Sequence, residues 1–173
     1  MPPIRVQPKS VNVLYPTEPG VLTAPAGEPQ PDRVVTVLAI SPLEDDHRSL
    51  RNIFAHSRWS LYQAHSCEEA VQVLRDNRIA VIITERELKE CYWNEVLARV
   101  SLLPPPLPRV VVASRRADDD LWSEALNLGA YNVLAKPFDG EEVFWVVSHA
   151  WLEWKSELER LFHPAPLALG ATA

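Results

Sequence analysis

Four polar residues stand where hydrophobic runs of the sequence end, and their types could do chemistry together. Ser41, Glu85 and Ser114 end or directly follow β-prone runs, and Lys136 follows a fourth run that ends at Ala135. If these runs are parallel strands of one sheet, their carboxyl ends meet at the same edge, where binding sites of such folds lie. A carboxylate and an ammonium group at that edge attract each other. We therefore expect an ion pair between Glu85 and Lys136, with Ser114 as a candidate third member.

The elements that must position these residues are visible in the hydrophobic pattern. Residues 34–40 and 79–84 are β-prone runs without polar alternation, which is typical of strands buried on both faces. Helix-length segments separate the runs, so right-handed crossovers and one covered parallel sheet are expected. The sequence predicts an α/β fold, a five-stranded parallel sheet of (βα)5 doubly wound type. Strands are expected at 34–40, 59–64, 79–84, 109–114 and 131–135, and helices from 44, at 66–77, 94–100 and 118–128, and from 139 to about 162.

Composition narrows the class of protein. The chain has 173 residues and a formal net charge of −6, which argues weakly against binding to nucleic acid. No apolar run approaches the roughly 20 residues that span a bilayer, and the first residues lack a secretory signal. The two cysteines are too few for a disulfide framework or a four-cysteine zinc site. We expect a cytoplasmic protein with no nucleic acid and no membrane as partner, with Cys67 as a small buried residue and Cys91 able to lie at the surface.

Proline marks the limits of the folded part. Eight of the 16 prolines fall within residues 1–31, and proline at that density cannot sustain a helix or a central strand. Residues 1–31 are therefore predicted to be an extended or disordered arm. The folded domain is expected at 32–163, and residues 164–173 are expected to be a flexible tail.

One segment near the predicted fifth strand carries a family resemblance. Residues 129–138 read G-A-Y-N-V-L-A-K-P-F, similar to the ending G-A-x-x-(aliphatic)-x-x-K-P-(aromatic) of the receiver domain of bacterial response regulators. Ser114 lies 22 residues before Lys136, and Glu85 lies 29 residues before Ser114, gaps that suit this family. The resemblance covers residues 34–154. It implies the flavodoxin-like receiver fold, a role in two-component phosphorelay signalling, and Pro137 as a candidate cis-proline that supports the active-site lysine.

The resemblance also assigns roles, and two of them depart from the family pattern. Ser114 and Lys136 match the switch hydroxyl and lysine, but Glu85 stands where the family has its phosphoacceptor aspartate. Ser41 and Pro42 stand where two acids would hold Mg²⁺, and neither is a good ligand for a hard cation. We therefore expect a degenerate receiver, or pseudo-receiver, with no metal and no cofactor. The acids that open the first helix could substitute as Mg²⁺ ligands, although acids at a helix N-terminus favour that helix in any case; they are Glu44, Asp45 and Asp46.

Three functions remain open at this point. The first is a stand-alone receiver-like protein that is not an enzyme, works without phosphorylation and acts by protein–protein interaction. The second is a working phosphoacceptor that uses Glu85 or a rebuilt Mg²⁺ site, and the third is a flavodoxin-type cofactor binder. Glu85 itself has two interpretations: it imitates the charge of a phosphorylated aspartate and favours one signalling conformation, or it only holds the sheet edge together.

The last predicted helix extends beyond the usual end of a receiver. Its later apolar residues are expected to have little surface of their own domain to cover, and such an exposed stripe marks an interface. We expect a homodimer through this helix or a protein partner, such as a histidine kinase or another regulator. The interface candidates are Trp154, Leu158, Leu161 and Phe162.

Overall fold

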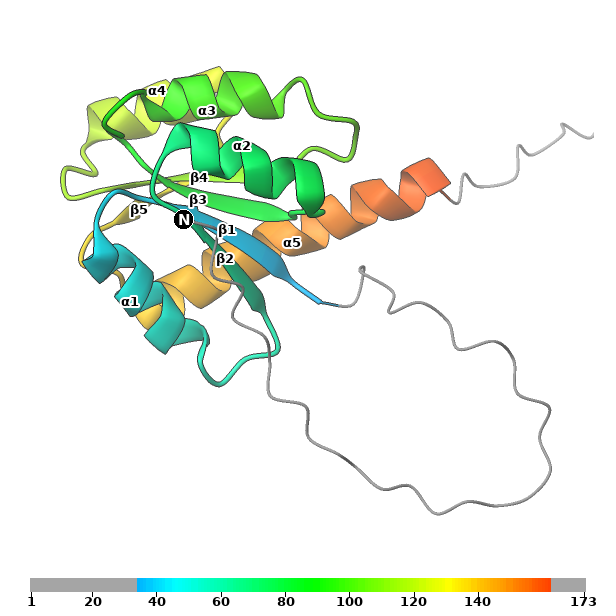
Figure 1. Ribbon diagram of the computed structural model, residues 1–173, viewed down its shortest axis with the longest axis horizontal. Helices are drawn as coiled ribbons and strands as arrows, with labels where there is room; N and C mark the ends of the chain where they lie inside the picture. Colours follow the sequence, from blue (N-terminus) through cyan, green and yellow to red (C-terminus); the bar gives the residue numbers. More distant parts are fainter. Residues whose placement is uncertain (1–33, 163–173) are drawn as a thin grey trace, which may run out of the picture.

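The computed structural model describes residues 34–162, so the expected arm and tail lie outside the described residues. Its centre is one parallel sheet in the order β2-β1-β3-β4-β5, which confirms the predicted doubly wound fold. Each crossover helix leads the chain back to the edge where the strands begin, so all five strands run in the same direction and end at the opposite edge (Figure 1). The strands are β1 (Thr36–Ile40), β2 (Ser60–Ala64), β3 (Val81–Glu85), β4 (Arg109–Ser114) and β5 (Asn132–Ala135).

Five helices cover the sheet in two layers. Two of them, the first and the last, lie on one face, and the other three lie on the opposite face (Figure 1). No helix within residues 34–162 is both long and apolar enough to cross a membrane. The helices are α1 (Glu44–Phe54), α2 (Cys67–Asp76), α3 (Trp93–Val100), α4 (Asp119–Leu128) and α5 (Gly140–Phe162).

The core follows the alternation of side chains along the strands. In β1, Val37 and Ala39 pack with α1 and α5, whereas Leu38 and Ile40 pack with α2 and α3. Both sets are completely buried, which explains why this run contains no polar alternation. The Ser41 amide then donates to the Ala64 carbonyl at 3.0 Å, which fixes the position of Ser41 directly after β1.

The second half of α5 corrects a prediction. Trp154 and Leu158 are 2% and 7% exposed, so they belong to the core and are not interface candidates. The Trp154 indole N–H donates to the carbonyl oxygen of Pro106 at 3.2 Å, and the Arg78 guanidinium lies 5.8 Å from the indole ring centre. The covering comes from the proline-rich segment before β4, which lies beside α5 in space. Leu161 and Phe162 are exposed, and their role in an interface stays a prediction.

Candidate functional site

The predicted site residues converge at the carboxyl edge of the sheet. Ser41 follows β1, Glu85 ends β3, Ser114 ends β4 and Lys136 follows β5. The backbone closes this edge, because the Lys136 amide donates to the Ser114 carbonyl at 3.0 Å and the Arg86 amide to that of Ala113 at 2.9 Å. The Lys136–Pro137 peptide is cis, at the position that the resemblance implied.

Lys136 is the centre of the site. Its Nζ forms ion pairs with Oε2 of Glu85 and with Oδ2 of Asp46. All three side chains are largely shielded from water, with relative exposures of 5% for Lys136, 14% for Glu85 and 11% for Asp46. The expected pair with Glu85 is present, but its third member is Asp46 rather than Ser114. We call these three residues the lysine triad; it carries one positive and two negative formal charges.

Asp46 enters the triad because of the phase of α1. Successive residues of a helix point about 100° apart, so three neighbouring acids cannot serve the same place. Asp46 turns inward and also accepts a hydrogen bond from the Ser41 hydroxyl. Glu44 and Asp45 turn outward, where they pair with Arg51 and Arg48. All three acids lie in the first turn of α1, as the interpretation of them as acids of the helix N-terminus expects, and Asp46 in addition pairs with Lys136.

Ser114 faces a different space from the triad. Its Oγ accepts the Arg116 amide at 3.1 Å, and within the described residues no hydrogen bond joins this hydroxyl to the Lys136 ammonium group. It lines an open hollow of about 420 Å³, whose other walls include Glu85 and the arginines Arg86, Arg115 and Arg116. The space enclosed around the triad is only about 10 Å³, at the lower limit for one water molecule.

The side chains present do not fit a bound Mg²⁺ ion of the kind that the family implies. A hard divalent cation needs several oxygen ligands that are free to bind it. Here Asp46 and Glu85 both neutralise Lys136, Asp46 also holds Ser41, and Pro42 offers only a backbone carbonyl. Within residues 34–162, no group of three or more candidate ligands gathers in metal-binding geometry.

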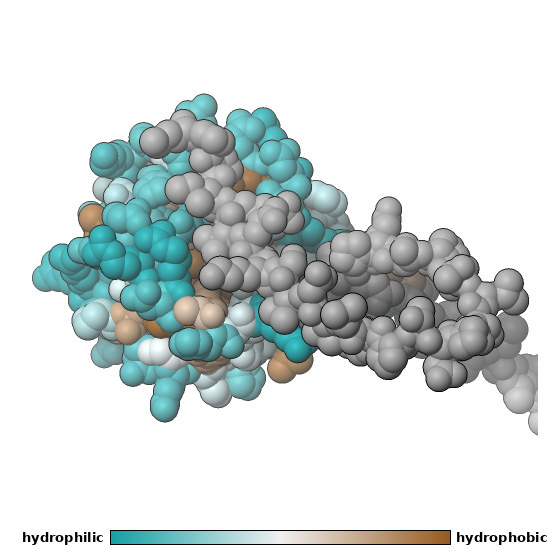
Figure 2. All heavy atoms as spheres, turned by 60° about the horizontal axis from the view of Figure 1, so that its bottom comes forward, coloured by the Kyte–Doolittle hydropathy of each residue, from teal (hydrophilic) through white to brown (hydrophobic). Residues whose placement is uncertain are grey.

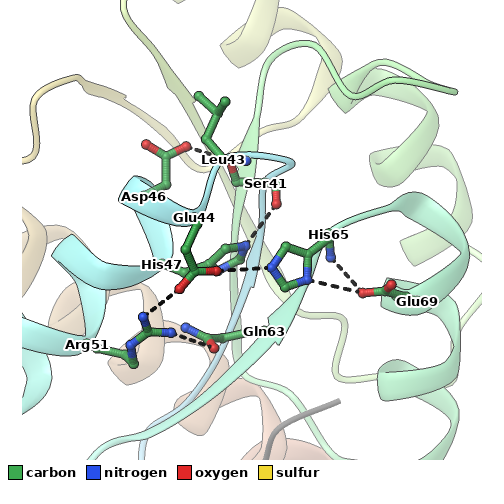
Figure 3. A network of polar contacts seen from close by, with 9 residues as sticks. All are labelled: Ser41, Leu43, Glu44, Asp46, His47, Arg51, Gln63, His65 and Glu69. Carbon is green, nitrogen blue, oxygen red and sulfur yellow. Dashed lines mark hydrogen bonds and ion pairs between the residues drawn. The ribbon is translucent and has the colours of Figure 1, made fainter. Parts of the chain in front are cut away.

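A second polar network joins the triad to α1 and β2 (Figure 3). The buried His47 ring places Nε2 at 2.8 Å from the Ser41 carbonyl, while its Nδ1 has no partner in the described part of the chain. Burial lowers the pKa of His47 below its ordinary value of 6.5. The His65 ring lies 4.5 Å away, between the carboxylates of Glu44 and Glu69. A hydrogen bond from Arg51 holds the pKa of Glu44 below its ordinary value. Sequence reasoning missed this network, because its residues are scattered among α1, β2, α2 and the loops that follow β1 and β2.

The loop between β3 and α3, residues 86–92, closes over one side of the site. It folds back on itself, because the Leu88 amide donates to the Cys91 carbonyl at 2.9 Å and the Trp93 amide to that of Arg86 at 3.1 Å. Leu88 and Cys91 are its buried side chains. Cys91 is 4% exposed and joined to Cys67 by a disulfide bond, so the prediction that it can lie at the surface is wrong. We call residues 86–92 the site loop.

Comparison with known proteins identifies the class. The model of the response regulator receiver domain family matches residues 43–148, which is more than half of the chain. This protein therefore belongs to the response regulator receiver domain family. No curated protein matches the chain in sequence.

Solved receiver structures share its fold at low sequence identity. The signal receiver domain of an HD domain-containing protein from Pseudomonas fluorescens Pf-5 is 24% identical with a TM-score of 0.66, over 73% of this chain and 93% of that one. The chemotaxis response regulator CheY4 of Vibrio cholerae is 17% identical with a TM-score of 0.62, over 68% and 98%. The beryllofluoride-activated NtrC4 receiver domain dimer is 23% identical with a TM-score of 0.63, over 69% and 98%. These likenesses concern the fold.

Proposed function

We propose that this member of the receiver family works without phosphorylation and signals through contacts with other proteins, as a pseudo-receiver rather than an enzyme. The observation that carries the proposal is the lysine triad. Two carboxylates already satisfy Lys136, and Ser41 and Pro42 occupy the positions at which a working receiver holds its metal ion. The site is thus complete in itself as a buried ionic cluster.

Glu85 is poorly prepared to accept a phosphoryl group. Its Oε2 pairs with Lys136, and its Oε1 accepts the Arg86 amide at 3.0 Å, so both oxygens are engaged. Its carboxylate is also one methylene longer than that of aspartate. In-line transfer is sensitive to such displacements, and about 1 Å can cost on the order of a hundredfold in rate. Phosphoryl transfer in this family also relies on a metal ion that neutralises charge next to the acceptor, and Ser41 and Pro42 supply no carboxylate to hold one.

The fixed charge of the triad offers an alternative to phosphorylation. Glu85 places one formal negative charge against Lys136, where a phosphorylated aspartate would carry up to about two. The triad also fixes α1 to the ends of β3 and β5 through Asp46. We infer that the domain is held in one signalling conformation, and that regulation acts on its partners or on the surface that they bind.

The experiment that tests this proposal is intact-protein mass spectrometry after incubation with acetyl phosphate and Mg²⁺, with a working receiver in the same tube. The expected result is a phosphoryl adduct on the working receiver and none on this chain. NMR with beryllofluoride and Mg²⁺ should leave the signals of Glu85, Ser114 and Lys136 in place. An adduct on this chain, or shifts of those signals, would support the other function, a working phosphoacceptor with a rebuilt Mg²⁺ site.

A matched pair of variants tests whether the metal site or the length of Glu85 prevents phosphorylation. In the double variant Pro42→Asp, Glu85→Asp, an acid stands after β1 and aspartate stands at the acceptor position. We expect this variant to gain a metal-dependent adduct, whereas Glu85→Asp alone stays unmodified because its metal site is still missing. An adduct on the single variant would show that the length of Glu85, rather than the metal site, blocks the reaction.

The contact surface is proposed on α5. Trp145 and Leu152 lie seven residues apart on one side of this helix and are 58% and 53% exposed, and Leu161 and Phe162 add 47% and 61% near its end. The visible part of the face in Figure 2 is mostly hydrophilic, with hydrophobic side chains in separate small areas. Because tryptophan is common among the residues that contribute most to protein interfaces, Trp145 is a candidate anchor for a protein partner. The partner is a histidine kinase, another regulator or a second copy of the chain.

Light scattering over a concentration series tests the homodimer. The expected result is a mass that rises with concentration in the native chain and stays monomeric in Trp145→Glu. The control is Trp122→Glu on α4, which should behave as the native chain does. A monomer at all concentrations would leave a different protein as the partner. The cytoplasmic location stays a prediction.

A further inference from the structure

The two cysteines of the chain meet beside the functional site, although they are 24 residues apart in sequence. Cys67 is the first residue of α2, and Cys91 lies near the end of the site loop. Their Cα atoms are 6.7 Å apart, within the range of about 4.4–6.8 Å that a disulfide bond requires. Both residues are 4% exposed. The two elements are therefore placed for a bond without movement of the backbone.

The bond acts on a loop with few other buried anchors. Glu87, Lys89, Glu90 and Tyr92 of the site loop are exposed, so Leu88 and Cys91 hold it to the domain. The start of the loop is part of the site, because the Arg86 amide donates to both Glu85 Oε1 and the Ala113 carbonyl. A covalent link at Cys91 thus limits the motion of a segment whose other end holds Glu85.

The surroundings of the pair determine how it can react. Cys67, Cys91 and Leu88 share one apolar cluster with residues of α2 and α3, such as Ala70 and Val96. A soluble thiol or disulfide cannot reach sulfur atoms in this cluster while the loop is closed. Oxidation and reduction therefore require the site loop to open first, so the rate of thiol–disulfide exchange depends on how often the loop opens.

We propose that Cys67 and Cys91 form a reversible disulfide whose redox state controls the mobility of the site loop. The co-reactant is a small disulfide such as oxidised glutathione. One protein thiolate attacks a glutathione sulfur and releases one glutathione thiolate. The second protein thiolate then attacks the protein sulfur of the mixed disulfide and releases the second glutathione. The two protein thiols lose two electrons and two protons overall, and the glutathione disulfide becomes two thiols.

The first experiment measures the redox state of the full chain. The protein is equilibrated in glutathione buffers from fully reduced to fully oxidised, quenched with acid, then unfolded in guanidinium chloride at neutral pH with N-ethylmaleimide, and weighed intact. We expect two labels at the reduced end, none at the oxidised end, and a monomeric protein without bound glutathione. Two labels in every buffer, a glutathione adduct on one cysteine or a disulfide between two chains would each overturn the proposal.

The second experiment measures the loop. Hydrogen exchange of residues 86–93 should be at least about tenfold slower in the oxidised chain than in the reduced chain, while exchange in β4 stays equal. The variants Cys91→Ala and Cys67→Ala should exchange as the reduced chain does under both conditions, and the agreement of two different variants guards against a local packing defect in one of them. Equal exchange of the loop in both redox states of the native chain would overturn the coupling. Neither result depends on whether Glu85 is phosphorylated.

Discussion

Two clusters of the same charge composition lie at opposite ends of the sheet. At the carboxyl edge, Lys136 is shared by Asp46 and Glu85. At the amino edge, Arg109 at the start of β4 is shared by Glu153 and Glu157 of α5, with N–O distances of 3.9 and 2.7 Å. The two clusters differ in how far their side chains are exposed to water. The side chains of the lysine triad are at most 14% exposed, whereas Arg109 is 23%, Glu157 28% and Glu153 60% exposed.

This difference determines what each cluster can do. Water and salt screen the charges around Arg109, so the cluster adds little free energy and α5 is held there mainly by Trp154 and Leu158. Within the triad the charges depend on one another, because each has given up much of its hydration. The same set of charges therefore adds little where water reaches it and defines a site where it is buried.

The largest expected effect comes from removal of the buried cation. Lys136→Met leaves Asp46 and Glu85 as two buried carboxylates without a counterion, and we expect the free energy of unfolding to fall by about 3–5 kcal/mol. Urea denaturation measures it. The control Lys155→Met removes a lysine that is 31% exposed, pairs with Glu159 at 3.8 Å and lies 5.3 Å from the centre of the Trp151 ring, and it should change stability by less than about 1 kcal/mol. Equal effects of the two variants would remove the distinction between the clusters.

The second largest expected effect is a loss of stability when the indole of Trp154, near the amino edge of the sheet, is replaced. Trp154→Phe removes an indole N–H and leaves the Pro106 carbonyl without its donor, together with a small cavity. We expect a loss of about 1–3 kcal/mol. Thermal and urea unfolding of Trp145→Phe, at a site 58% exposed, provide the matched comparison and should show little change. A loss confined to Trp145→Phe would contradict the assignment of Trp154 to the core.

The third effect concerns the screened cluster itself. A double-mutant cycle of Arg109→Met and Glu157→Gln should give a coupling free energy of no more than about 1 kcal/mol, and it should shrink as salt is raised. The same salt series on Lys136→Met should leave its larger loss nearly unchanged. A strong, salt-independent coupling at Arg109 would mean that this cluster is as dry as the triad.

The smallest effect is a dependence on pH next to the triad. Because the folded chain resists protonation of His47 and the unfolded chain does not, the unfolded state binds more protons once the pH falls below about 6.5. Stability should therefore decline as the pH falls through that region. His47→Gln should remove this part of the decline, whereas His56→Gln, at an exposed position, should retain it. Parallel pH profiles for both variants would show that other groups cause the decline.

The sequence was sufficient for the sheet and for most residues at its edge. Continuous apolar runs and the segment around Lys136 and Pro137 are local signals. The parallel arrangement of the strands then brings their carboxyl ends, and the residues there, to the same edge. Asp46 was not predictable with the same ease, because the phase of α1 decides which of three neighbouring acids turns inward. Trp154 and the cysteine pair depend on contacts between segments that are distant in sequence, and no local pattern carries that information.

The burial of Trp154 and Leu158 has a consequence for where this domain may be cut. The family model ends at residue 148, but α5 continues to Phe162 and contributes Ala150, Trp154 and Leu158 to the core. A fragment that stops at the end of the family match would lack three buried side chains and the donor to Pro106. The unit that folds is thus longer at its carboxyl end than the unit that the family shares, and any transplant of this domain into another protein must carry the whole helix.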